Sequence, residues 1–182
     1  IDNNQAIDWI NYTGGYSNEE SMYLSEGMFL PETYMIPRKS KVSTLLQRAH
    51  EALLNTLAEE WLNRTMEIPL GSPYEGLILA SIIEKETAVP DERAKIASVF
   101  IERLKINMRL QTDPTIIYGL GNAFNGDLTR TNMRLDTPYN TYTRYGLPPT
   151  PIALPGIESI KAALNPADEK NIYFVATGND DG

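Results

Sequence analysis

The sequence has 182 residues, a formal net charge of −8 and no cysteine. A chain of this length can bury a core without disulfides or a structural metal, and the missing thiols exclude cysteine nucleophiles and cysteine–zinc sites. The acidic balance argues against nucleic acid as a partner, because binding a phosphate backbone requires a basic face. No run of ~18 apolar residues is present, so the sequence predicts no membrane-spanning helix.

The N-terminal third is predicted to be a polar lead-in, a loop and one helix. Residues 1–25 are weakly patterned and belong, in this interpretation, to a preceding region. Residues 26–40 hold two prolines among large apolar side chains, which indicates extended chain or loop. From Lys41 to Leu62 apolar residues recur every three or four positions, which predicts a helix. Its His50, the only histidine, is expected to be a helix-surface or capping residue, although any Ser–His–Asp triad would need it.

Clear helix signals follow. Ser72 fits an N-cap, Pro73 the first turn and Glu75 a capping box, so a helix is expected to run to about Thr87. A second helix is predicted from Pro90 to near residue 107, with an apolar face.

Beyond these helices the composition changes. From residue 111 to 156 Gly, Pro, Asn, Thr and Tyr dominate, which favours loops and short strands. A last helix is predicted from Ile157 to Leu164 and a strand from Asn171 to Gly178. The final Gly-Asn-Asp-Asp-Gly lacks the spacing of a calcium loop, and no metal site is predicted. We therefore expect an α+β fold in which helices form one wall of a cleft and a smaller lobe of strands and loops forms the other.

Two glutamates end the helix that starts after Ser72. At ~100° per residue, Glu84 and Glu86 point roughly 200° apart, so they cannot act as a catalytic pair. Glu86 shares its face with Leu79, Ile82 and Ile83, and desolvation by such neighbours raises the pKa of a carboxyl group. A glutamic acid that stays protonated near neutral pH can donate its proton to the leaving oxygen of a glycosidic bond. The alternative is a solvated helix end with Glu86 bonded to an arginine.

The segment from residue 136 to 156 suits a sugar, since it holds three tyrosines, several amide and hydroxyl side chains and five prolines. Aromatic rings can stack on sugars, Asn and Thr can bond hydroxyls, and prolines reduce the entropy lost on binding. An ordinary proline-rich surface loop with core tyrosines is the alternative. Asp113, in "RLQTDPT", is either another carboxylate of the site or a turn residue before proline.

Longer motifs make the chain resemble one family. The segments "LASIIEKETAVPDERAKIASVFIERLKINMRLQTDPTIIYGLG" (79–121), "YNTYTRYGLPPTPIALPGIESIKAALNPA" (139–167) and "YFVATG" (173–178) resemble, in this order, the YceG-like endolytic murein transglycosylases. "EGMFLPETY" resembles the stretch that precedes them in the family. The resemblance covers about residues 26–182 and implies a catalytic domain over that range, with a lysozyme-like helical wall.

The resemblance implies an enzyme that cuts peptidoglycan glycan strands internally during cell-wall assembly. The family's catalytic glutamate matches Glu86. It would protonate the oxygen between N-acetylmuramic acid and N-acetylglucosamine, and then accept the proton of the muramoyl 6-hydroxyl, which attacks C1 and leaves a 1,6-anhydro end. No cofactor is implied. Glu84 is expected in a second layer behind Glu86. The candidates for binding or orienting the sugar are Gln111, Asp113, Tyr139, Asn140, Thr141 and Tyr142.

Family members are typically held on the cytoplasmic membrane by an N-terminal helix followed by a LysM-like domain. The resemblance therefore implies the extracytoplasmic, periplasmic side of a bacterial membrane, with membrane contact only through an anchor outside this sequence. The implied partners are peptidoglycan strands and cell-wall synthases of the penicillin-binding type. Because the family continues with a histidine-containing segment after the last strand, the domain is expected to be truncated at its C-terminal end.

Two other functions stay open at this point. A conventional hydrolase would pair Glu86 with Asp113 or Asp136 as the second carboxylate. A non-catalytic domain would bind glycan as a scaffold that recruits wall synthases.

Overall fold

The structure is a computed structural model that describes residues 26–173. Within that range it consists of α-helices, two short 3-10 helices and loops, and no strand is formed. The expected α+β class, with its β-containing lobe, is therefore wrong for the described residues, whereas the expected helical wall is present. The strand predicted from Asn171 does not form over residues 171–173, and its remainder lies outside the described residues, as does the lead-in of residues 1–25.

The first described helix, α3 (Val42–Leu62), agrees with its predicted bounds to within one residue. Its C-terminal half packs into the core through Leu53, Leu57 and other apolar residues. The loop before α3 returns along the helix: Leu30 N–H donates to the carbonyl oxygen of Ala49 at 3.1 Å. His50 takes part in this contact, because its Nδ1 lies 2.9 Å from the carbonyl oxygen of Met28. The histidine thus fastens a loop to a helix.

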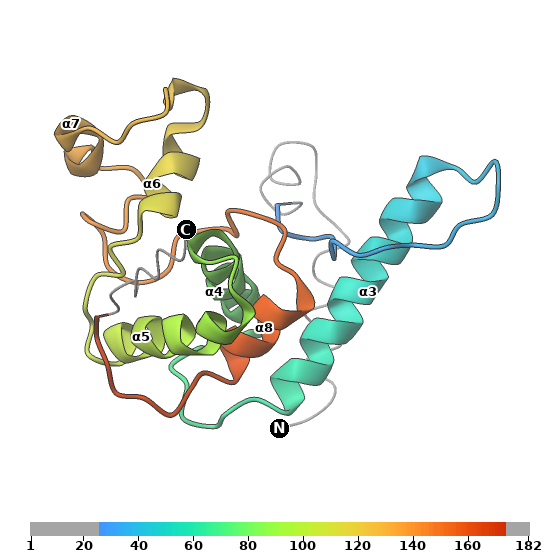
Figure 1. The fold of residues 1–182 in the computed structure, drawn as a ribbon, viewed down its shortest axis with the longest axis horizontal. Coiled ribbons are helices and arrows are strands. Elements are labelled where there is room, and N and C mark those ends of the chain that lie inside the picture. Colours follow the sequence, from blue (N-terminus) through green and yellow to red (C-terminus); the bar gives the residue numbers. More distant parts are fainter. Residues whose placement is uncertain (1–25, 174–182) are drawn as a thin grey trace, which may run out of the picture.

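Helix α4 (Pro73–Glu86) is the centre of the molecule, since its residues 76–83 are all buried (Figure 1). Ser72 Oγ accepts from Glu75 N–H at 3.2 Å, as predicted for an N-cap. The capping box is completed one residue earlier than expected, because the Glu75 carboxylate accepts from Gly71 N–H at 2.6 Å.

Helices α5 (Arg93–Lys105) and α8 (Ile157–Leu164) complete the body, α5 being preceded by the 3-10 helix η1 (Pro90–Glu92). Helix α8 contacts α3, α4 and α5 and lies between α5 and α3 in Figure 1. Its approach to α4 is close: a Cβ atom added to Gly76 would lie 2.8 Å from Leu164 Cδ2. Glycine at this position therefore allows the two helices to meet.

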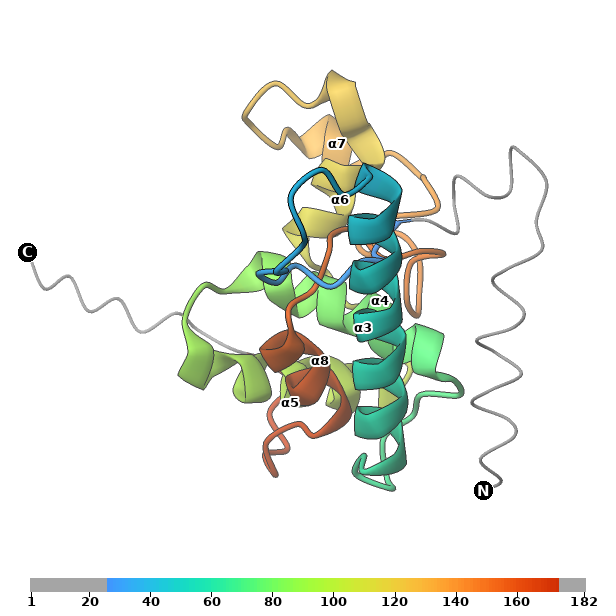
Figure 2. The same cartoon turned by 90° about the vertical axis from the view of Figure 1, so that its right-hand side faces the viewer.

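Two short helices replace the expected strands. Helix α6 (Asp113–Leu120), the 3-10 helix η2 (Gly121–Ala123) and α7 (Arg130–Arg134) form an arm that stands off the body (Figures 1 and 2). Thr129 and Asn132 form a capping box at the start of α7. At its other end, Asn140 Nδ2 donates to the carbonyl oxygens of Met133 and Leu135 at 3.1 and 2.7 Å. Side chains thus satisfy both ends of a five-residue helix.

No helix among residues 26–173 is both long and apolar enough to cross a bilayer.

Candidate active site

Glu86 is the last residue of α4 and is partly buried. Leu79, Ile82 and Ile83, on the same face of the helix, have no exposed surface. The hydroxyl of Thr112 donates a hydrogen bond to Glu86 Oε1. Burial raises the pKa of the Glu86 carboxyl above its ordinary value and the charge of Asp113 adds to this, while the Thr112 hydrogen bond and the charge of Arg103 act in the opposite direction. The alternative was a solvated helix end with Glu86 bonded to an arginine. Among the described residues Glu86 forms no ion pair, and its carboxyl group accepts a hydrogen bond from Thr112 instead.

Three buried threonines, Thr112, Thr115 and Thr141, form a cluster behind this carboxyl group. Thr115 Oγ1 donates to the carbonyl oxygen of Thr112 at 2.8 Å, and its oxygen lies 2.9 Å from Thr141 Oγ1. Thr112 N–H donates to Thr141 Oγ1 at 3.1 Å. Thr141 Oγ1 also donates to the carbonyl oxygen of Thr112, at 3.4 Å. The threonine cluster therefore joins the start of α6 to the loop after Tyr139 and orients the Thr112 hydroxyl toward Glu86.

Three other candidates lie close to this cluster. Tyr142 OH donates to Asp113 Oδ1 at 2.7 Å, and burial together with this carboxylate raises the pKa of the tyrosine. Gln111 N–H donates to the carbonyl oxygen of Thr141 at 3.2 Å. The side chain of Gln111 is exposed and its φ is 50°, a left-handed conformation that is uncommon for a residue with a Cβ atom. Asp113 and Tyr142 thus lie within electrostatic reach of Glu86, while Gln111 is joined to the loop that carries Thr141.

Tyr139 and Asn140, also expected to bind or orient the sugar, make contacts within the protein instead. Tyr139 OH lies 2.9 Å from Thr150 Oγ1, and its ring centroid is 4.8 Å from that of Tyr118. The side chain of Asn140 is buried against the end of α7, and its Oδ1 accepts from Tyr142 N–H at 2.9 Å. Both residues hold the loop that carries Thr141 and Tyr142, rather than facing Glu86.

Glu84 is directed at α8. Its Oε2 accepts from Gly156 N–H at 3.0 Å and from Ser159 Oγ at 2.6 Å, at the N-terminus of that helix. The positive end of the helix dipole favours a carboxylate there. Its hydrogen bonds therefore lead away from Glu86, as the roughly 200° between the two side chains predicts.

Two neighbours of Glu86 were missed by the sequence interpretation. Arg103 of α5 is only 6% exposed, and its Nε donates to the carbonyl oxygen of Ile172 at 2.8 Å while Nη1 donates to that of Leu110. Arg103 lies seven positions after Ile96, on the apolar face of its helix. A charged residue on such a face is unusual, and this could have marked Arg103 as a buried residue with a specific role. Thr112 precedes Asp113 and Pro114, a sequence typical of a helix N-terminus that we interpreted as a turn.

Asp136 has a partner of its own. It pairs with Arg144 at 2.7 Å, and the hydrogen bond from this arginine lowers the pKa of Asp136. The carboxylate is exposed and is not suited to share a proton with Glu86. No group of three or more His, Cys, Asp or Glu residues within 26–173 is placed to hold a metal ion.

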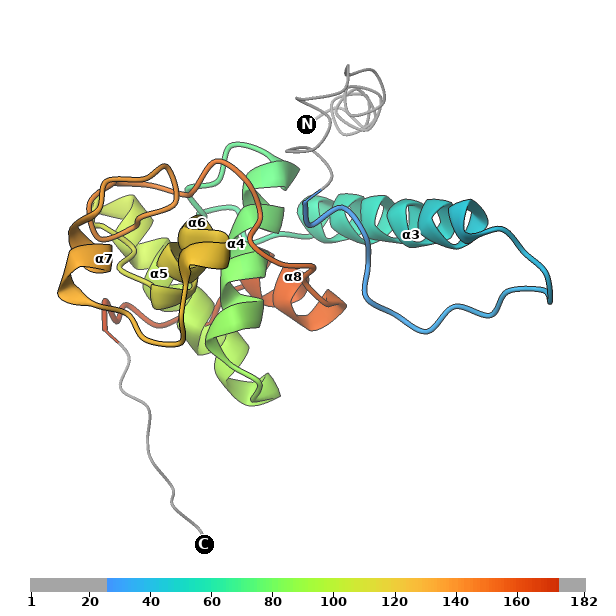
Figure 3. The same ribbon diagram turned by 90° about the horizontal axis from the view of Figure 1, so that it is seen from above.

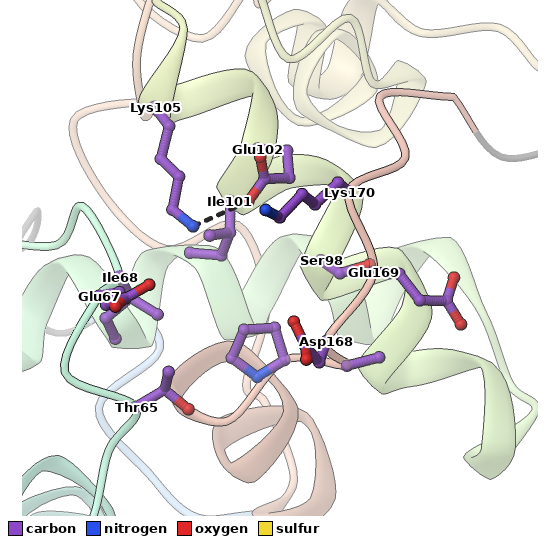
Figure 4. Close-up of a pocket in the computed structure, with 12 residues that line it drawn as sticks. Thr65, Glu67, Ile68, Ser98, Ile101, Glu102, Lys105, Asp168, Glu169 and Lys170 are labelled. Atoms are coloured by element: carbon purple, nitrogen blue, oxygen red, sulfur yellow. Dashed lines mark hydrogen bonds and ion pairs between the residues drawn. The ribbon is translucent and has the colours of Figure 1, made fainter.

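Three surface hollows lie near the body. Two of them, of about 260 and 450 Å³, share residues 146–149 of the proline-rich loop, and Thr141 lines the smaller one. The third, of about 180 Å³, lies between α5 and residues 65–68 and 166–170 (Figure 4). The ion pair between Lys105 and Glu102, 2.8 Å long, lies in it. Of these three hollows, the one lined by Thr141 adjoins the threonine cluster.

These features define a helical protein in which the partly buried Glu86 carboxyl, its pKa raised by burial, is held by the Thr112 hydroxyl. The model of the YceG-like family matches residues 2–182, and the chain belongs to this family. It is 36% identical over 170 residues to the endolytic murein transglycosylase of Bacillus subtilis, covering 92% of this chain and 46% of that protein. The protein of the same name from Streptococcus pneumoniae D39 is 32% identical over 158 residues, 85% of this chain and 28% of its own length.

A solved structure has the same fold. The 2.6 Å crystal structure of a yceG-like protein from Listeria monocytogenes superposes with a TM-score of 0.73 at 34% identity, covering 93% of this chain and 54% of that one. The chain therefore spans about half the length, or less, of the relatives it matches.

Proposed function

We propose that residues 26–182 are the catalytic domain of an endolytic lytic transglycosylase, with Glu86 as its acid and base. The observation that carries the proposal is that one partly buried glutamate, with burial raising its pKa, is held by the Thr112 hydroxyl. Its two possible carboxylate partners are occupied, Asp113 by Tyr142 and Asp136 by Arg144. A single protonatable group is what an intramolecular attack requires.

In this mechanism, the protonated Glu86 donates to the glycosidic oxygen as the bond from C1 of N-acetylmuramic acid to that oxygen breaks. The resulting carboxylate then accepts the proton of the muramoyl 6-hydroxyl, whose oxygen bonds to C1. The products are a 1,6-anhydro end and a free N-acetylglucosamine hydroxyl, and Glu86 regains its proton. No water enters the products. The burial that favours the protonated form and the Thr112 hydrogen bond that favours the ionised form support the two halves of this cycle.

The names of the B. subtilis and S. pneumoniae relatives support peptidoglycan as the substrate. We accordingly place the activity in the cell wall, on the extracytoplasmic side of the bacterial membrane, with wall synthases as candidate partners. Gln111, Asp113, Thr141 and Tyr142 are proposed to line the glycan site around Glu86, with Tyr139 and Asn140 supporting them.

The test compares Glu86→Gln with Glu84→Gln, the same substitution two positions away on α4. Glu86→Gln should reduce cleavage of purified glycan strands by a factor of roughly 10² to 10⁴, because the proton donor is lost. Glu84→Gln should retain cleavage, since an amide oxygen can still accept the bonds from α8. Product ends are identified by mass spectrometry.

Unchanged cleavage in the Glu86→Gln variant would refute the assignment. Reducing ends, heavier than anhydro ends by one water, would instead support a two-carboxylate hydrolase. Glycan binding without any cleavage by the wild-type chain would support the scaffold function.

A further inference from the structure

The N-terminal end of α3 projects from the molecule together with the loop that precedes it. We call residues 33–48 the tip. In Figures 1 and 3 the tip extends beyond the other helices, on the side of the body opposite the arm of α6 and α7. Arg48 Nη1 donates to the carbonyl oxygen of Met35 at 2.8 Å, which fastens the loop to the helix. The tip is therefore a convex, tethered element that is free on its outer side among the described residues.

The tip exposes large apolar side chains. Met35 is 87% exposed and Val42 72%, while Ile36 and Leu46 are 40% and 45% exposed. Val42 and Leu46 lie one helical turn apart, so they share a face of α3. From Ala49 onward the same helix turns an apolar face to the body and buries Leu53 and Leu57 there. Its first two turns thus continue the apolar stripe beyond the point at which the body covers it.

The tip is also the basic part of an acidic chain. Between Glu32 and Glu51 there is no acidic residue but there are four cations, whereas the whole sequence has 16 basic and 24 acidic residues. Within residues 26–173, Arg38, Lys39 and Lys41 form no ion pair. Lys39 has a φ of 72°, in a turn closed by Ser40 N–H donating to the carbonyl oxygen of Pro37 at 3.1 Å. This turn holds the basic side chains next to the apolar ones.

We propose that the tip inserts into the headgroup region of a membrane that contains anionic lipid. Exposed apolar side chains flanked by lysine and arginine are the composition of elements that lie in the membrane interface. A stable protein partner would have to cover roughly 800 Å² of surface, whereas a deformable lipid surface can surround a projecting tip. The chain's negative charge does not prevent this contact, because at physiological ionic strength charges beyond about 8 Å are largely screened.

This surface is independent of the catalytic assignment, and it adds a membrane contact to the one expected from an N-terminal anchor alone. The test is co-sedimentation of the 182-residue chain with vesicles of phosphatidylglycerol and phosphatidylcholine in equal parts, and with vesicles of phosphatidylcholine alone. Binding is expected only to the anionic vesicles, and it should weaken as salt is added. The double variant Lys39→Glu/Lys41→Glu should bind at least about tenfold more weakly, and Met35→Ser/Val42→Ser should also bind more weakly at constant charge.

The matched control is Arg130→Glu/Arg134→Glu, which makes the same change of charge on the exposed surface of α7. This control should bind like the wild type. The proposal is overturned if the wild type does not bind anionic vesicles at low salt, or if the control loses binding as strongly as the tip variant. A tip variant that leaves vesicle binding intact but abolishes self-association or capture of a protein partner would also overturn it.

Discussion

The Thr112 hydroxyl donates a hydrogen bond to the Glu86 carboxyl group and opposes the rise in its pKa that burial causes. Thr112→Val removes this hydroxyl at nearly constant shape, while its backbone N–H can still bond to Thr141. Because the lost hydrogen bond stabilised the ionised form, the pKa of Glu86 should rise. The basic limb of the pH–rate profile for kcat/KM should move to higher pH, since the proposed mechanism needs Glu86 protonated in the free protein.

Cleavage by Thr112→Val should fall roughly tenfold, the equivalent of one hydrogen bond to a charged group. Thr112→Ser keeps the hydroxyl and should restore both the rate and the wild-type pH profile. A Thr112→Val variant with reduced activity but an unmoved basic limb would show that the threonine acts only through packing.

When ionised, near neutral pH, Glu86 is expected to lower the free energy of unfolding of the chain. Burial raises its folded-state pKa above the unfolded value. With this sign, its contribution to stability is fully present below the unfolded pKa and is lost as the pH rises through the folded pKa. Glu86→Gln cannot ionise, so it should unfold at a higher temperature than the wild type near neutral pH. The difference should vanish below about pH 4.3, the pKa of an unperturbed glutamate.

Thermal unfolding of both proteins across this pH range tests the prediction. A wild type that is more stable than Glu86→Gln near neutral pH would contradict it, because the ionised carboxyl would then be better satisfied in the fold than in water.

At the scale of elements, the contact between α4 and α8 depends on Glu84 as well as on apolar packing. Glu84→Ala leaves Gly156 N–H and the Ser159 hydroxyl without their acceptor. We expect the free energy of unfolding to fall by about 1–3 kcal/mol, measured by urea denaturation. The folded fraction should still cleave glycan, because the bonds of Glu84 do not involve Glu86.

Glu158→Ala is the control for this substitution. Glu158 is also in the first turn of α8, but it is exposed, and its one ion pair among the described residues is with Lys161 at 3.1 Å. An exposed pair of this kind contributes at most about 1 kcal/mol. Equal losses of stability in both variants would mean that Glu84 acts merely as an exposed charge near a helix end.

At the scale of the whole molecule, the chain divides into a packed body and two projections. Helices α3, α4, α5 and α8 enclose the apolar core, while the arm of α6 and α7 and the tip of residues 33–48 extend on opposite sides (Figure 1). The arm begins at the threonine cluster and so contributes Thr112 and Asp113 to the site. The tip contributes no residue to that site, which is why vesicle binding and glycan cleavage can be tested separately.

The body helices could be predicted because their signals are local. Apolar residues at three- and four-residue spacing and the Ser72 cap are properties of adjacent residues, and they identified α3, α4, α5 and α8. The separation of Glu84 from Glu86 also follows from helix geometry alone. The arm could not be predicted in this way, because α7 has only five residues and is held by Asn140 from a later loop.

The sequence by itself therefore determined the helical body, the separation of the Glu86 and Glu84 side chains and the resemblance to the YceG-like family. Only the tertiary structure decided that helices and loops, rather than strands, lie beside Glu86, and that Thr112 and Arg103 act on its carboxyl group. The physical reason is separation along the chain. Thr112 lies 26 residues from Glu86, and the hydrogen bonds and desolvation that set the pKa of a side chain act through space, between segments that no local pattern connects.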